Sequence, residues 1–154
     1  MSRSRIIEIA QAEIGTTEMP ANSNLTKYGK WFGLDAQPWC AIFCSWCYDQ
    51  AGHPLDPIGF SKGFASVPMA LDRWRGQITK DPKPGDLVIF DWQKDGKVDH
   101  VGLFVEWIDQ KAGTFQTIEG NTSVSNDSNG GAVMKRQRNM AFVTAFIVPL
   151  IYLS

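Results

Sequence analysis

Cys40 and His100 are the residues of this chain whose chemistry suggests nucleophilic catalysis. Cys40 follows Pro38-Trp39 at the first turn of a segment that predicts a buried helix over about 39–51. A thiol at such a position lies in the field of unpaired backbone N–H groups, which favours the thiolate over the thiol. A thiolate can attack an acyl carbon when a histidine is within reach. The segment therefore predicts Cys40 as the nucleophile of a cysteine hydrolase.

The base that such a nucleophile needs must be one of two histidines. His53 follows the far end of the predicted helix, and a rise of 1.5 Å per residue puts it about 18–20 Å from Cys40. His53 is therefore excluded, and we expect it to lie in an exposed turn. His100 begins an alternating segment, 98–105, that predicts a strand, and Gly102 on the same face leaves space beside the imidazole. A histidine of this kind is often structural, and its pairing with Cys40 makes it the candidate base.

A third group is expected to hold the imidazole in its useful tautomer. The segment 114–121 predicts the next strand, and its alternation places Glu119 and Asn121 on one face. Glu119 would be the stronger orienter of an imidazolium, whereas Asn121 could orient the ring or bind a developing oxyanion. Without the cysteine–histidine pair, Glu119–Ser123 would be interpreted as a polar strand end and turn.

The elements that must position these residues follow an α+β order. Helices are predicted first and strands after them, with Lys94-Asp95-Gly96-Lys97 as a hairpin signal. We expect N-terminal helices packed on a C-terminal antiparallel sheet of about five strands, in a single domain over 1–154. The predicted helices cover about 6–14, 28–32, 39–51 and 67–74, and the strands about 86–92, 98–107, 114–120, 131–138 and 142–149.

Composition excludes several classes of protein. The chain has 154 residues, 44% of them hydrophobic, with six Trp and nine Phe, as expected for a globular protein. A formal charge of −1 gives no electrostatic case for nucleic-acid binding. The longest apolar stretch is too short to span a membrane, and the first residues lack the apolar core of a signal peptide. We therefore expect a monomer that neither inserts into membranes nor binds nucleic acid.

Four motifs, in this order and spacing, resemble those of a CHAP domain, one of the cysteine, histidine-dependent amidohydrolases/peptidases. This family is related to the NlpC/P60 group and, more distantly, to papain-like proteases, and the resemblance covers nearly the whole chain. It implies a papain-like, NlpC/P60-like fold and cleavage of amide bonds in bacterial peptidoglycan, an activity of many phage endolysins. The motifs are 27–41, ending in Gln37-Pro38-Trp39-Cys40-Ala41, then 84–90, Asp99-His100-Val101-Gly102, and Ile118-Glu119-Gly120-Asn121-Thr122.

Carried over position by position, the resemblance makes Cys40 the nucleophile, His100 the base, and Glu119 and Asn121 the acid and amide of the site. Its implied partner is bacterial peptidoglycan. The bond that is cut stays open between the N-acetylmuramoyl-L-alanine amide and a bond within the stem or cross-bridge. Without a signal peptide, we expect synthesis in a host cytoplasm and action on the cell wall, as for a phage lysin released by a holin or an injected effector.

The chain departs from the family pattern just before the cysteine. Some members carry an acidic calcium loop there, but 33–37 has a single carboxylate, Asp35, too few for a cation that takes six to eight oxygens. We therefore expect no metal site and no cofactor. Many members have glutamine immediately before the cysteine, where this chain has Trp39. Gln37 is then the candidate oxyanion donor, and Trp39 a candidate substrate contact.

Two other functions compete with hydrolysis. Cys44-Ser45-Trp46-Cys47 is a CxxC pattern, but a redox CxxC stands at a helix start after a strand, and a zinc site with Cys40 would lack a fourth ligand. The second alternative is a non-catalytic wall-binding module with an aromatic groove, which would not explain the cysteine–histidine pair. Its groove would draw on Trp31, Phe32, Trp39, Trp92 and Trp107.

Overall fold

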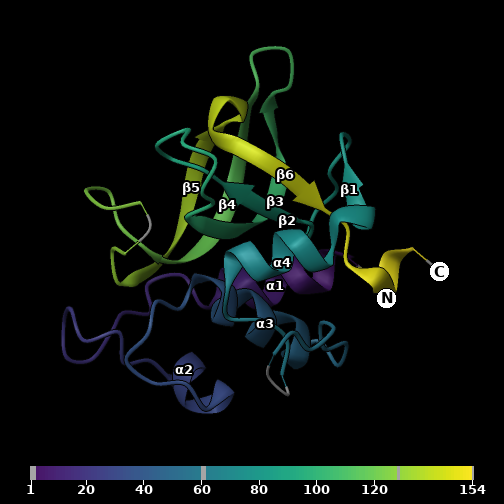
Figure 1. Cartoon of the computed structure of the whole chain (residues 1–154). Helices are drawn as coiled ribbons and strands as arrows, with labels where there is room; N and C mark the ends of the chain where they lie inside the picture. The colour runs from purple at the N-terminus through teal and green to yellow at the C-terminus, as the bar shows by residue number, and fades with distance from the viewer. Residues whose placement is uncertain (1–2, 60–61, 128, 154) are drawn as a thin grey trace.

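Helices on one side and a curved antiparallel sheet on the other form the two layers of the fold (Figure 1). The computed structural model describes residues 3–59, 62–127 and 129–153. Over those residues the helices are α1 (Arg3–Ala12), α2 (Lys27–Phe32), α3 (Cys40–Gln50) and α4 (Val67–Arg73), with short 3-10 turns at Arg75–Gln77, Met140–Phe142 and Leu150–Tyr152. No helix in these described ranges is long and apolar enough to cross a bilayer.

The sheet has six described strands in the order β1-β6-β2-β3-β4-β5, and all neighbours are antiparallel. This confirms the predicted α+β class and the five predicted strands. The sixth, β1, has only two residues and pairs with the end of β6, so it is too short to show alternation in the sequence. The strands are β1 (Ile78–Thr79), β2 (Leu87–Phe90), β3 (His100–Asp109), β4 (Thr114–Thr122), β5 (Ala132–Asn139) and β6 (Val143–Ile147).

Helix α3 packs against α1, α2, β3 and β4. Eight of its eleven residues are buried, which explains its almost continuous run of apolar and small residues. Its one small hydroxyl, Ser45, donates to the Ala41 carbonyl at 3.0 Å and accepts from the Phe64 N–H at 3.0 Å. The helix ends at Gln50, shortly before Gly52 at φ 80°, as the sequence predicts.

The start of α3 approaches β4 closely because Gly120 has no side chain. A Cβ at position 120 would lie 2.7 Å from Phe43 Cβ and 2.9 Å from Trp39 Cζ3. Contacts this short do not occur between real side chains, so only glycine allows the helix and strand to meet here. This contact sets the distance between the sheet and the start of α3, which carries Cys40.

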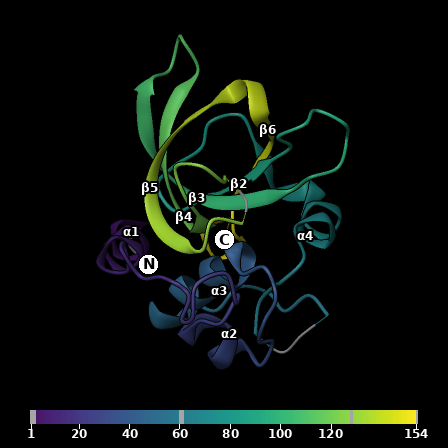
Figure 2. The same cartoon turned by 90° about the vertical axis from the view of Figure 1, so that its left-hand side faces the viewer.

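Both faces of the sheet carry buried side chains near its centre, and Figure 2 shows the helices gathered on one side of the sheet. The helices cover one face, where Val101, Leu103 and Ile118 join the main core. The other face carries an aromatic cluster in which Phe90, Phe104, Phe115 and Phe146 pack together. A residue on either face near the middle of the sheet is therefore withdrawn from water.

The connection between β2 and β3 places His100 at the start of its strand. The Asp91 carboxylate accepts from the Gly96 N–H at 2.8 Å, and the Asp99 carboxylate accepts from the Trp92 N–H at 2.9 Å. These bonds satisfy the backbone of the predicted hairpin, in which Gly96 has φ 84°. His100 then pairs with Phe90 across the ladder.

Candidate active site

Cys40 is the first residue of α3 and is only 5% exposed. Burial alone raises the pKa of its thiol, but the charge of the neighbouring His100 imidazolium and hydrogen bonds from His100, Val101 N–H and Ala41 N–H outweigh it. The pKa of Cys40 therefore lies below the ordinary value. A lowered pKa at a helix start makes Cys40 a nucleophile.

His100 is fully buried, and its imidazole lies between Cys40 and Glu119. Its Nε2 is 2.9 Å from Glu119 Oε1, so Nδ1 is the ring nitrogen left to interact with the Cys40 thiol. Burial lowers the pKa of the ring, but the negative charges of Cys40 and Glu119 raise it to about 9. Each group therefore favours the charged form of the other, a thiolate beside an imidazolium.

Glu119 lies in β4 and is fully buried. Four side-chain atoms of three residues, His100, Thr117 and Arg138, hydrogen-bond to its carboxylate. The Thr117 hydroxyl donates to Oε2, and Arg138 donates through Nε to Oε2 at 2.8 Å and through Nη2 to Oε1 at 2.6 Å. Burial raises the pKa of the carboxyl, but the Arg138 bonds and the His100 charge lower it to about 2. Glu119 therefore carries a fixed negative charge against the imidazole.

The space beside His100 that the sequence attributes to Gly102 is filled by Glu119. A Cβ at position 102 would lie 2.6 Å from Glu119 Cγ. Gly102 therefore does not open a path to the imidazole. It allows the carboxylate of the neighbouring strand to lie across β3 and reach the ring.

Asn121 does not share the orientation of Glu119, contrary to the predicted alternation. The β4–β5 register shifts between Glu119 and Thr122, and Asn121 has φ 58°, so a β-bulge interrupts the period of two. Its side-chain nitrogen donates to Asn129 Oδ1 at 3.2 Å and its Oδ1 accepts from the Gly131 N–H at 3.1 Å. These bonds close the 123–131 loop, and Glu119 is the group that contacts His100 Nε2.

The two residues before Cys40 differ in environment. Gln37 lies exposed in the loop before the helix, and its role as an oxyanion donor stays a prediction. Trp39 is fully buried, and its indole N–H donates to Glu18 Oε2 at 3.0 Å while its ring stacks on Tyr28 with centroids 5.5 Å apart. The structure thus contradicts the expected substrate contact of Trp39, because a side chain with no exposed surface supports the helix start instead.

Arg138, on β5, is a site residue that the sequence analysis missed. It is 7% exposed, and besides binding Glu119 it donates through Nη1 to Asp127 Oδ1 at 2.7 Å. The register pairs Arg138 with Phe115, not with Glu119, so strand pairing alone does not connect the two charges. The sequence did contain a signal for it. Alternation puts Arg136 and Arg138 on one face of their strand, and a buried carboxylate in the sheet needs a cation as its partner.

The structure gives little support to the redox, zinc-binding and wall-binding alternatives. Cys44 and Cys47 are buried free thiols whose pKa values burial raises well above the ordinary range. Trp92 and Trp107 pack on the aromatic cluster of the sheet face opposite the helices, and Phe32 is also buried. Most of the proposed groove residues therefore belong to the core. Such thiols and rings are structural in character.

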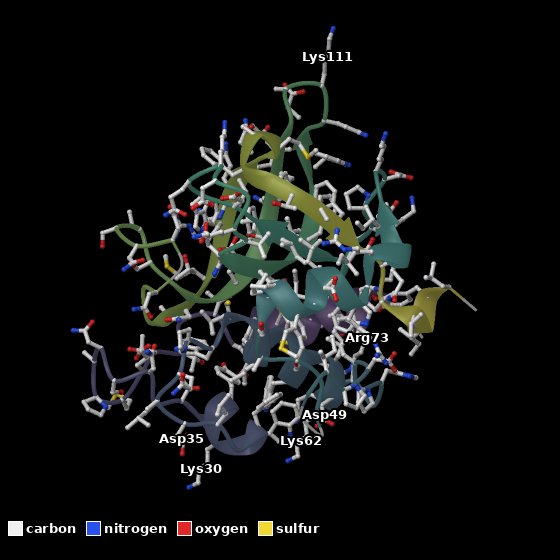
Figure 3. All side chains as sticks on the ribbon, in the orientation of Figure 1. Lys30, Asp35, Asp49, Lys62, Arg73 and Lys111 are labelled. Carbon is white, nitrogen blue, oxygen red and sulfur yellow. The ribbon has the colours of Figure 1, made fainter. Side chains whose placement is uncertain are left out.

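Metal-ligating side chains do not cluster in the part of the chain that the structure describes: no group of three His, Cys, Asp or Glu residues could hold an ion there. Asp35, the lone carboxylate of the loop before Cys40, lies at the outer edge of the molecule beside Lys30 (Figure 3). The described residues therefore offer a cation no coordination shell of the usual size.

Comparison with known proteins identifies similar structures and a family for this chain. Two solved structures share the fold: the endolysin LysIME-EF1, with a TM-score of 0.62 at 15% identity, and Ly7917, with a TM-score of 0.56 at 12% identity. Each alignment covers 97% of this chain, which spans 64% and 63% of the respective relatives. Comparison with curated protein sequences gives no significant match. The model of the CHAP domain matches residues 32–121, more than half of the chain and the part that contains Cys40, His100 and Glu119, and the chain therefore belongs to the CHAP domain family.

Proposed function

We propose that this CHAP domain hydrolyses an amide bond of bacterial peptidoglycan through a thioester on Cys40. Family membership implies a cysteine- and histidine-dependent amidase or peptidase. The observation that carries the proposal is the buried chain of contacts from Cys40 at the start of α3 through His100 to Glu119. This arrangement supplies a nucleophile, a base and an orienting acid in one place.

The reaction follows from the charges of the resting site. The Cys40 thiolate attacks the carbonyl carbon, and the carbonyl electrons move to oxygen to give a tetrahedral oxyanion. As that oxyanion collapses, the C–N bond breaks and His100 donates its proton to the leaving amine, which leaves a thioester. The neutral imidazole then takes a proton from water, the hydroxide attacks the thioester, and release of the acid returns Cys40 as a thiolate beside a protonated His100.

Glu119 and Gln37 serve this reaction in different ways. Glu119 holds the imidazole through Nε2 and stabilises its charged form, which leaves Nδ1 as the ring nitrogen available to the thiol. Gln37, exposed in the loop before the helix, is the side chain we propose for the oxyanion.

A lytic role on the cell wall is supported by the fold that the chain shares with an endolysin. We propose the same role here, with synthesis in a host cytoplasm and release onto the wall. Both bond classes, the N-acetylmuramoyl-L-alanine amide and a peptide bond of the stem or cross-bridge, fit a thioester mechanism. Mass spectrometry of fragments from purified walls distinguishes them by the new amino terminus and by the presence or absence of a freed glycan.

Digestion of purified peptidoglycan by single-residue variants tests the proposal. We expect Cys40→Ser and His100→Ala each to lower turnover at least about 10³-fold, because each removes a member of the nucleophilic unit. His53→Ala is the matched control, since His53 lies beyond the C-terminal end of α3, and it should digest walls as the wild type does. Near wild-type digestion by either site variant would refute the mechanism.

A further inference from the structure

Arg138 makes a nearly fully buried, two-point ionic contact with Glu119. Its Nε and Nη2 bind the two oxygens of Glu119 at 2.8 and 2.6 Å, and the side chains are 6% and 0% exposed. A two-point bond between a guanidinium and a carboxylate fixes orientation as well as charge. The carboxylate plane of Glu119 is thus set from β5, while its other partner, His100, is on β3.

Arg138 is itself held on its remaining sides. Its Nη1 donates to Asp127 Oδ1 at 2.7 Å, and its guanidinium lies 4.6 Å from the centroid of the Trp92 ring. Asp127 also accepts from Arg136 at 3.1 Å, which joins the 123–131 loop to β5. A side chain restrained at three points holds one rotamer, and a burial this deep would be unfavourable for an unpaired charge.

We propose that Arg138 is a positioning residue, which fixes the Glu119 carboxylate and, through it, the imidazole of His100, without touching the substrate. The proposal rests on the proposed cysteine hydrolysis and extends the chain of contacts by one residue. It makes the reactivity of Cys40 depend on β5, two strands away from the β3 strand that carries His100.

The charged and titratable neighbours of Glu119 show why the cation is needed. His100 faces it from β3, Arg138 from β5 and the Cys44 thiol from α3, while the Thr117 hydroxyl binds it from its own strand. Without Arg138 a fully buried carboxylate would keep one hydroxyl and one imidazole, and burial would favour its neutral form. A neutral Glu119 no longer stabilises the imidazolium, so the Cys40 thiolate loses its partner.

The test is the pH dependence of Cys40 alkylation by iodoacetamide in the intact protein. In Arg138→Gln the acidic limb of the alkylation rate should move to higher pH by about one unit or more, because Glu119 now titrates within the range where the ion pair forms. Arg138→Lys restores the charge but not the two-point bond, and its limb should lie between those of Arg138→Gln and the wild type. If Arg138→Gln does not fold, Arg138→Lys carries the test.

The matched control is Arg136→Gln. Arg136 lies two residues away on β5 and shares Asp127 with Arg138, but its other bonds are to Thr122 and the Ser123 carbonyl. Its removal loosens the same loop without exposing Glu119, so the alkylation profile should match that of the wild type. A shift in this control as large as that of the Arg138 variants would show a general loosening and overturn the proposal.

A double variant separates positioning from a structural role. If Arg138 acts through Glu119, the profile of Glu119→Gln/Arg138→Gln should superimpose on that of Glu119→Gln. A further shift in the double variant, or a wild-type profile in both single Arg138 variants, would overturn the proposal. Alkylation needs no substrate, so a failure of wall digestion would remove the proposed function and leave this result standing on its own.

Discussion

The charge of His100 depends on two neighbours, the Cys40 thiolate and the Glu119 carboxylate. Both raise the pKa of the imidazole, which reaches about 9 although the ring is completely buried. Burial alone would have left the ring neutral at physiological pH. The site therefore works as an ion pair only while both anions are present.

Replacing Glu119 by Gln tests this dependence. The substitution keeps the shape of the side chain and removes the charge, so the pKa of His100 falls. We expect the basic limb of the pH–rate profile to move from near 9 to lower pH by about one unit or more. The measurement is the initial rate of wall digestion between neutral pH and pH 10.

Asn121→Ala is the control for that shift. Its amide is engaged with Asn129 and Gly131, and it carries no charge, so its loss should lower turnover and leave the basic limb in place. A limb that moves in Asn121→Ala and stays fixed in Glu119→Gln would exchange the two roles.

How much of the site could be predicted from the sequence follows from the range of the interactions. Cys40 and His100 could be proposed as partners from the sequence because a helix start and a strand alternation are local patterns. Asn121 was placed wrongly because its bulge depends on the pairing of β4 with β5, which shifts register at that point. Arg138 was missed because it reaches Glu119 from a position registered opposite Phe115.

The packing of α3 against β4 depends on Gly120, and a methyl group there should disturb it. A Cβ would overlap Phe43 and Trp39, both fully buried, so neither can move aside easily. We expect Gly120→Ala to lower the free energy of unfolding by about 1–3 kcal/mol, the usual range for overpacking. Urea denaturation measures the change, and wall digestion should also slow because the helix start carries Cys40.

Gly76→Ala provides the matched substitution. Gly76 lies in the 3-10 turn Arg75–Gln77, and a Cβ there meets nothing within 4 Å. Its free energy of unfolding should stay within about 0.5 kcal/mol of the wild type. Equal stability of the two variants would show that α3 and β4 can separate without loss, contrary to the packing described.

Elements were predicted well where they are long and periodic. The α3 helix and strands β2 to β6 appear within a few residues of their predicted bounds, because most of them are continuous or alternating runs of apolar residues. The two-residue β1 has no pattern of its own and exists because the end of β6 offers it hydrogen bonds. Long-range pairing of this kind cannot be inferred from one segment.

The stability of the whole domain should depend on pH through the same buried groups. The pKa of Glu119 is about 2 in the folded protein against an ordinary value of 4.5, so its stabilisation is present above pH 4.5 and is lost as the pH falls towards 2. The pKa of His100 is raised from 6.5 to about 9, so its contribution is complete below 6.5 and is lost as the pH rises through 9. We therefore expect the highest free energy of unfolding between pH 4.5 and 6.5.

Urea denaturation across pH, on the wild type and Glu119→Gln, checks this expectation. The variant should show a flatter fall in stability between pH 4.5 and 2, because it lacks the group whose protonation opposes folding there. Glu106→Gln, which removes an exposed carboxylate of β3, should keep the wild-type slope. Parallel acid slopes in wild type and Glu119→Gln would assign the acid sensitivity to other carboxyl groups.

The order of the site residues along the chain determines when Cys40 becomes reactive during synthesis. Cys40 leaves the ribosome first, His100 and Glu119 follow, and Arg138 comes last of the four. Synthesis adds about 5–20 residues per second, so several seconds separate the cysteine from the strands that complete its surroundings. During that time Cys40 has neither its imidazole nor the buried carboxylate, and it has the reactivity of an ordinary thiol. A nascent chain thus carries only an ordinary thiol at position 40, and the reactive thiolate arises only when β3, β4 and β5 have packed beside α3.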